Sequence, residues 1–153
     1  IDRANRTGDE ISLALLDLDH FKAVNDTHGH LGGDAALSTV ARVVERSLLA
    51  MRTDDDPLVA RYGGEELAIL LPGVGEAGAR RITESIREAV SRTPIHHDST
   101  EFRLTLSAGV TARNGLMITS RSLIAAADEA LYLAKSNGRN RVEVADQSIS
   151  IPR

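Results

Sequence analysis

The sequence contains no cysteine, no tryptophan and few other aromatic residues. Without cysteine, its 153 residues form no disulfide, no cysteine-based zinc site and no thiol nucleophile. Aromatic residues make up 3% of the chain, too few for the stacking platforms that bind single-stranded nucleic acid. The apolar runs are far shorter than a membrane span, and no signal peptide is recognisable, so we expect no direct membrane contact. A cytoplasmic location is the default expectation, which leaves open membrane attachment of a longer parent protein.

The composition is that of a folded domain with a slight excess of acids. Apolar residues make up 42% and charged residues 26%, and the length fits a single domain over residues 1–153. The formal net charge is −4, which disfavours a large basic surface for nucleic acid. Acids gather near Asp17 and Glu65 and require cations, which indicates a divalent metal.

Hydrophobic patterning predicts helices alternating with strands. An apolar run over 11–19 is typical of a central strand, and stripes at helical spacing indicate a helix over 76–92 and a second helix, with its stripe over 123–134, that ends at Asn137-Gly138. A short helix over 20–27, a loop over 29–33 and a helix with Asp34 as its N-cap are expected between them. Further strands are expected over 102–113 and 140–145. The fold class is therefore α/β (α+β), with helices on a largely antiparallel sheet.

A glycine pair joins two short apolar runs, 58–60 and 67–71, within Arg61-Tyr-Gly-Gly-Glu-Glu-Leu67. This pattern predicts a β-hairpin, with Gly63 and Gly64 taking the positive φ angles that tight turns need. Glycines also let a ligand approach the backbone closely, and two acids, Glu65 and Glu66, follow at once. The combination suits a metal-bound phosphate better than it suits a plain surface turn.

A second pair of acids ends the first strand. Asp17 and Asp19 alternate with Leu18, so both carboxylates project from one side of the strand. If this strand neighbours the hairpin, an acid from each can hold Mg²⁺ between them. In the alternative interpretation the aspartates merely end a strand and the glutamates face solvent, and the spacing alone favours neither.

Three separated motifs resemble those of GGDEF-domain diguanylate cyclases: residues 16–34, the variant signature Gly63-Gly-Glu-Glu-Leu67, and residues 126–142. The resemblance covers nearly the whole chain. It implies a palm-like nucleotide-cyclase fold and the condensation of two GTP molecules into cyclic di-GMP, with release of two pyrophosphates. It also implies Mg²⁺ or Mn²⁺ as cofactor and a transient antiparallel homodimer of half-sites, in bacterial second-messenger signalling.

The resemblance assigns roles to individual residues. The metal would be held by Asp17, the Leu18 carbonyl and Glu65, while Glu66 would support the attacking hydroxyl. Asn25 and Asp34 would read guanine, whose N1–H and amino group need acceptors. Phosphate contacts would come from Phe21, Lys22, Gly63, Gly64, Lys135 and Arg139, the last two as cations on one helix face. Without the resemblance, the sequence favours another interpretation, in which Asn25 is a helix-end residue and Asp34 an N-cap. The two cations, Lys135 and Arg139, would then complement the charge of a helix C-terminus.

The chain departs from the family pattern in three places. Leu67 replaces phenylalanine at a packing position. The inhibitory Arg-x-x-Asp motif is absent in register, where Asp54 and Pro57 stand, and Arg52 and Asp55 lie two residues too early. We therefore expect no high-affinity product inhibition. The family's opening segment and any upstream regulatory domains also lie outside this sequence, so the fragment is expected to be weakly active or inactive alone.

Two other functions stay open at this level, a non-catalytic nucleotide-binding module and a cyclase that uses adenine or mixed purines. Asp34 speaks against the second. The histidines form no convincing ligand set, His96 and His97 are expected in an exposed loop, and Tyr132 in the core or at its rim.

Overall fold

The computed structural model describes residues 1–51, 55–113 and 119–146. Five strands form one sheet in the order β2-β3-β1-β6-β7, and every neighbouring pair is antiparallel except β6–β7. The strands are β1 (Ile11–Leu18), β2 (Leu58–Arg61), β3 (Glu66–Pro72), β6 (Leu106–Ala112) and β7 (Val142–Val144). The helices are α1 (Asp2–Thr7), α2 (Phe21–Ala50), α3 (Glu76–Arg92) and α4 (Ser120–Ser136). The expected class, helices on a largely antiparallel sheet, is confirmed.

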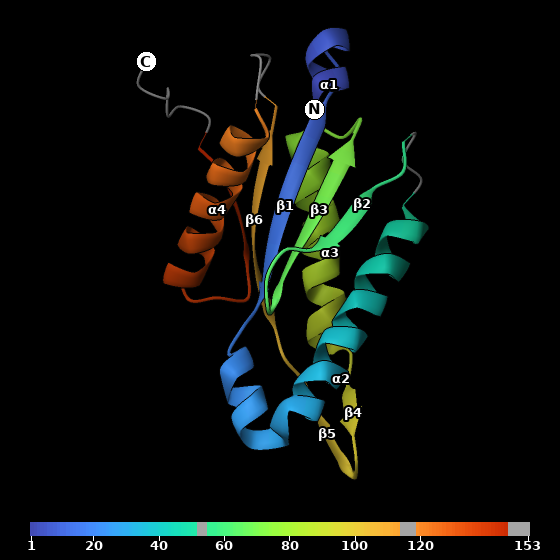
Figure 1. Cartoon of the computed structure of the whole chain (residues 1–153), viewed down its shortest axis with the longest axis vertical. Coiled ribbons are helices and arrows are strands. Elements are labelled where there is room, and N and C mark those ends of the chain that lie inside the picture. Colours follow the sequence, from blue (N-terminus) through green and yellow to red (C-terminus); the bar gives the residue numbers. More distant parts are fainter. Residues whose placement is uncertain (52–54, 114–118, 147–153) are drawn as a thin grey trace.

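The two faces of the sheet are covered by different helices (Figure 1). Side chains at alternate positions of β1, including Leu16 and Leu18, join the main core with α2 and α3. The intervening side chains, Leu13 and Leu15, pack in a smaller cluster with Leu123 and other residues of α4. Because strand side chains alternate, Asp17 lies on the α4 side of β1, just beyond this smaller cluster.

Helices α3 and α4 confirm their predicted stripes. Both are long enough and regular enough that burial follows the helical period closely. The buried positions are Ala79, Ile82, Thr83, Ile86 and Val90 in α3 and Leu123, Ala127, Ala130, Leu131 and Ala134 in α4. Tyr132 is 69% exposed, so its expected place in or near the core is wrong.

Helix α2 differs from the prediction. Gly29 (φ 73°, ψ 173°) breaks it, but the chain is helical again from His30, so the expected loop over 29–33 shrinks to one residue. Asp34 therefore lies within the helix and is not an N-cap. Gly32 and Gly33 are buried, and a Cβ at Gly33 would collide with the Asn25 side chain. These two glycines allow close approach of two helical segments and do not mark a loop.

The strand expected over 102–113 is two strands. A small hairpin of β4 (Ile95–His97) and β5 (Thr100–Phe102) precedes β6, with a break at residues 103–105. The expectation that His96 and His97 lie in a loop is wrong, because both are in β4. The hairpin is held against α2, where the His28 ring stacks on Phe102 at 4.0 Å between ring centroids. Within the described ranges, no helix has the length and apolar character to cross a membrane.

Candidate functional site

The two acidic motifs meet across the β1–β3 pair. The register places Asp17 directly opposite Glu66, and the Leu18 amide donates to the Glu65 carbonyl at 3.3 Å. In an antiparallel strand the N–H and C=O of one residue face the same neighbour, so the Leu18 carbonyl also faces Glu65. The condition on which the metal hypothesis depends, that the first strand neighbours the hairpin, is met.

These acids influence one another electrostatically. The pKa of Glu65 is raised above its ordinary value, first by loss of hydration on burial and then by the negative charge of Asp17, with a further contribution from Glu66. The Lys135 ammonium opposes this shift. Three carboxylates and one cation therefore lie within electrostatic reach of one another at the end of β1.

Lys135 lies in the last turn of α4 and reaches the acids directly. Its Nζ is 3.0 Å from Oδ2 of Asp17, whose side chain is 11% exposed. The ammonium supplies the counter-charge that a largely buried carboxylate requires. The structure thus brings Lys135 into the site, in contact with an acid that the resemblance assigns to the metal.

The β2–β3 turn is closed by a side chain that the sequence reasoning missed. Arg61 donates from Nε to the Gly63 carbonyl at 3.1 Å and from Nη2 to the Gly64 carbonyl at 2.6 Å. The amides of Tyr62 and Gly63 donate to the Glu66 carbonyl at 2.8 and 3.3 Å. An arginine immediately before a Tyr-Gly-Gly turn was the available signal, since a guanidinium can bind two carbonyls at once.

The two glycines of this turn matter for the room beside the backbone and not for its φ angles. Neither Gly63 nor Gly64 has a positive φ, so that expectation is wrong; the longer turn bound by Arg61 does not need it. A Cβ at Gly63 would lie 2.5 Å from Oε2 of Glu66, whereas a Cβ at Gly64 would meet nothing within 4 Å. The backbone at Gly64 is therefore open to approach from outside the protein.

The start of α2 fits the expected phosphate contacts. His20 precedes it in a left-handed conformation (φ 56°), and no side chain caps the helix. The first amides of a helix, here those of Phe21 and Lys22, have no intrahelical acceptor and suit an anion. The Lys22 side chain is exposed and pairs with Asp26 at 2.8 Å. Asn25 faces Gly33 across the kink at Gly29. Asp34, an exposed residue, directly follows Gly33 in the sequence.

Arg139 lies beyond α4 and not on it. The helix ends at Ser136, Asn137 is its C-cap, and Arg139 follows in a left-handed conformation (φ 63°). The expectation that Lys135 and Arg139 share one helix face is therefore wrong. Among the residues that the structure describes, the Arg139 guanidinium makes no hydrogen bond or ion pair, so it remains available to a ligand.

Asp19 is an acid whose two carboxylate oxygens both accept hydrogen bonds from the protein itself. It is 4% exposed and accepts hydrogen bonds from Thr105 Oγ1 (2.6 Å), Ser107 Oγ (2.7 Å) and the Asn140 amide (3.0 Å). Both of its oxygens are engaged by protein donors. Asp19 shares its side of β1 with Asp17, as expected, but it has a different environment.

The donor set suits a hard divalent cation. Within the described ranges no group of three His, Cys, Asp or Glu side chains could hold a metal alone. Asp17, Glu65 and the Leu18 carbonyl offer oxygen ligands, which Mg²⁺ prefers, and Mg²⁺ is commonly held by one or two carboxylates together with substrate phosphates and water. The residues present therefore fit a metal that arrives with a phosphorylated substrate.

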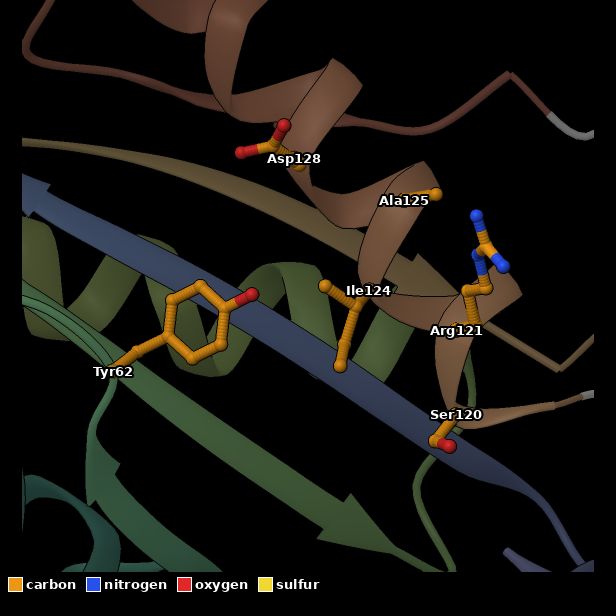
Figure 2. A pocket seen from close by; sticks show the side chains of 6 residues that line it. All are labelled: Tyr62, Ser120, Arg121, Ile124, Ala125 and Asp128. Atoms are coloured by element: carbon orange, nitrogen blue, oxygen red, sulfur yellow. The ribbon is translucent and has the colours of Figure 1, made fainter.

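Two pockets lie outside this cluster of acids. One, of about 500 Å³, lies between Tyr62 and the α4 residues Ser120, Arg121, Ile124, Ala125 and Asp128 (Figure 2). The other, of about 360 Å³, lies between the start of α2 and residues 102–105. Neither is lined by Asp17, Glu65 or Lys135, so we place the candidate site at the end of β1, on chemistry and not on cavity size.

The segment expected to carry the inhibitory motif is described only in part. Arg52 and Asp54 lie outside the described residues. Asp55 forms an ion pair with Arg3 of α1 at 3.5 Å, and Pro57 directly precedes β2. The absence of high-affinity product inhibition stays a prediction.

Comparison with known proteins gives consistent matches. Residues 1–141 match the family model described as diguanylate cyclase, GGDEF domain. The diguanylate cyclase DgcP of Pseudomonas aeruginosa is 41% identical over 143 residues, which are 94% of this chain and 20% of DgcP. The chain spans between 20% and 39% of the length of its curated relatives.

Solved structures agree in fold. The GGDEF domain of DgcB from Caulobacter crescentus, in complex with c-di-GMP, superimposes with a TM-score of 0.85 at 37% identity, over 94% of this chain and 82% of that one. The active GGEEF domain of a diguanylate cyclase from Vibrio cholerae gives a TM-score of 0.85 at 31% identity, over 96% and 90%. The GGEEF signature of that domain has two consecutive glutamates after the glycine pair, as Gly63-Gly-Glu-Glu-Leu67 has here.

Proposed function

Because this chain belongs to the GGDEF-domain family of diguanylate cyclases, we propose that it condenses two GTP molecules into cyclic di-GMP and releases two pyrophosphates. The observation that carries the proposal is the meeting of Asp17, Glu65 and Glu66 beside Lys135, at the end of β1. The c-di-GMP bound to the related GGDEF domain of DgcB supports the same product class.

Two of the acids and the Leu18 carbonyl would hold the metal. Asp17 and Glu65 provide the carboxylates, and Glu66 supports the attacking 3′-hydroxyl. Mg²⁺ or Mn²⁺ held there would supply Lewis-acid chemistry, which would polarise the phosphate and lower the pKa of the hydroxyl. Lys135, already 3.0 Å from Asp17, lies where its ammonium can neutralise phosphate oxygens once nucleotide occupies the site.

The remaining contacts orient the nucleotide. The amides of Phe21 and Lys22 and the backbone at Gly63 and Gly64, which is open at Gly64, face the triphosphate, together with Arg139. Asn25 and Asp34 accept hydrogen bonds from guanine. Positioning and electrostatic stabilisation then account for most of the catalysis.

One chain supplies a single set of these groups and so holds one GTP. Two copies face each other in an antiparallel pair, so that the 3′-hydroxyl of one GTP attacks the α-phosphorus of the other. The homodimer needs to last only for the reaction, which makes it transient.

The test uses the purified chain with GTP and Mg²⁺, with product identified by chromatography and mass spectrometry. We expect weak but measurable formation of cyclic di-GMP by the wild type and none by Glu65→Gln, with an unchanged circular dichroism spectrum. Glu129→Gln, which neutralises an exposed acid of α4, is the matched control and should retain activity. Turnover by Glu65→Gln would refute the metal assignment.

Two results would change the proposed function. Binding of GTP by the wild type without any product would favour the non-catalytic nucleotide-binding module. Competition by ATP as strong as that by unlabelled GTP would contradict the guanine assignment of Asn25 and Asp34.

A further inference from the structure

Asp19 is a buried acid next to the site that the proposed chemistry leaves without a role. It follows β1 two residues after Asp17, on the same side of the strand. Its three hydrogen-bond donors come from two places: Thr105 directly before β6 and Ser107 within it, and the Asn140 amide in the turn after α4. The carboxylate therefore joins the end of β1 to a turn 121 residues away in sequence.

That turn has an unusual backbone. Gly138, Arg139 and Asn140 have φ values of 115°, 63° and 46°, three left-handed residues in succession. Glycine adopts such angles freely and asparagine tolerates them, but arginine does so only where the surrounding structure enforces it. Residues held in this way cluster at functional sites. The strained residue here is Arg139, the proposed phosphate contact.

The turn is anchored on both sides of Arg139. The Arg139 amide donates to the Ala134 carbonyl at 3.0 Å, and the Asn140 amide donates to Asp19 at 3.0 Å. Arg87 of α3 donates to the Asn140 side chain at 2.8 Å. Of these anchors, only the Asp19 carboxylate is attached to the strand that carries Asp17.

We propose that Asp19 is a positioning residue, which holds the Arg139 turn in register with the metal-binding end of β1. This inference rests on the proposed function, in which Arg139 contacts the triphosphate. Asp19 is not a metal ligand, because three protein donors use its two oxygens and it is 4% exposed. The two aspartates thus have different roles: Asp17 faces the metal site, and Asp19 positions the phosphate-binding Arg139.

Removal of the carboxylate has a specific consequence. The Asn140 amide loses its acceptor, and Arg139 relaxes out of the left-handed region. The Arg139 guanidinium then no longer points at the triphosphate, while the guanine contacts of Asn25 and Asp34 stay in place. Affinity for a nucleoside triphosphate therefore falls, and affinity for the monophosphate does not.

The experiment is a double-mutant cycle measured by calorimetry on the whole chain. The ligands are 3′-deoxy-GTP with Mg²⁺, which lacks the attacking hydroxyl and so binds without turnover, and GMP. We expect Asp19→Ala to weaken 3′-deoxy-GTP binding by about 10-fold or more, the value of a lost charge-assisted contact, with GMP binding unchanged. In an Arg139→Ala background the same change should add nothing.

Two controls separate positioning from simple destabilisation. Ser107→Ala removes the 2.7 Å bond to the same carboxylate but leaves the Asn140 contact; it should lower the Tm without changing the ratio of the two affinities. Asp19→Asn keeps an oxygen for the Asn140 amide and presents an NH₂ group to the Ser107 hydroxyl, so it should stay within about 3-fold of the wild type in both affinities. If Asp19→Ala does not fold, Asp19→Asn decides: a 10-fold loss of 3′-deoxy-GTP binding would overturn the inference.

The remaining outcomes distinguish this inference from the proposed function. Equal losses for 3′-deoxy-GTP and GMP, or the same loss with and without Arg139, would show that Asp19 does not act through Arg139. Wild-type protein that binds neither nucleotide would overturn the proposed function, and this inference with it. Wild-type binding that is unaffected by Asp19→Ala would overturn the inference alone.

Discussion

Glu65 is a half-buried carboxylate with two other acids, Asp17 and Glu66, near it. Its raised pKa means that the folded chain holds the Glu65 proton more tightly than the unfolded chain does. By linkage, the stability associated with this group is present at low pH and is lost as the pH rises through its folded-state pKa. Once ionised, Glu65 therefore opposes folding in the absence of a metal.

Glu65→Gln should accordingly stabilise the metal-free protein while removing its activity. We expect a Tm about 2 °C higher than that of the wild type at pH 7, because the variant buries no charge there and removes the carboxylate repulsion. The difference should vanish below the ordinary pKa of 4.5, where Glu65 is protonated in both states. Thermal melts in EDTA from pH 4 to pH 8 test this, with Glu129→Gln as control. A gain that persists at pH 4 would contradict the electrostatic cause.

Gly64 separates the requirements of folding from those of binding. Its φ is not positive and a Cβ there would meet no atom within 4 Å, so Gly64→Ala should leave the Tm unchanged or slightly higher. If the triphosphate passes over this backbone, the added methyl group should weaken 3′-deoxy-GTP binding by about 10-fold, the cost of a displaced phosphate contact. Calorimetry on both proteins measures the effect. Unchanged affinity would remove Gly64 from the phosphate site.

Some site residues were predictable from sequence and others were not, for a physical reason. Asp17 and Glu65 stand out because each is an acid at the end of an apolar run, which is a local signal. Asp19 was visible as an acid, but its role depends on partners 86 to 121 residues away. Arg61 was missed because its bonds to the turn carbonyls exist only once the hairpin has formed.

At the scale of elements, sequence periodicity predicted the long amphipathic helices and the sheet, and it failed where tertiary contacts decide. Helices α3 and α4 carry regular apolar stripes, so their burial followed from the sequence. The strand over 102–113 breaks because Phe102 pairs with β4 and stacks on His28. The segment over 29–33 was predicted as a loop because glycine is typical of loops. In the structure Gly32 and Gly33 lie in a helix and allow close packing.

The break in α2 depends on Gly29, which has a φ of 73° and a ψ of 173°, a region open only to glycine. Gly29→Ala should cost about 1–3 kcal/mol of stability and, by changing the angle between the two segments, separate Asn25 from Gly33 and Asp34. GTP binding should therefore fall by more than the loss of stability explains. Urea melts and calorimetry with 3′-deoxy-GTP measure the two effects.

The matched control for this change is Gly8→Ala. Gly8 also has a positive φ (78°) and an open surrounding, but it ends α1, far along the chain from the guanine-binding residues. The alanine variant should lose about 1 kcal/mol and keep its nucleotide affinity. If both variants lose affinity equally, the break in α2 has no special role in recognition.

At the scale of the whole molecule, the described residues form one candidate site, at the end of the central strand β1. Asp17, Glu65, Lys135 and Arg139 all lie toward that end of the sheet, and the two pockets elsewhere contain none of these groups. If each chain binds one GTP, as proposed, a product built from two nucleotides needs two copies. The net charge of −4 makes their encounter unfavourable at low ionic strength, so we expect a weak and transient dimer.

The dependence of rate on enzyme concentration tests this assembly. If two weakly associating chains must meet, the initial rate of cyclic di-GMP formation should rise with about the second power of enzyme concentration while most of the protein is monomeric. At higher concentrations the order should fall toward one as the dimer becomes populated. Moderate salt should speed the dilute reaction, because it screens the repulsion between two acidic copies. A first-order dependence throughout, with product formed at every dilution, would contradict the transient dimer, because either one chain suffices or the two copies do not dissociate.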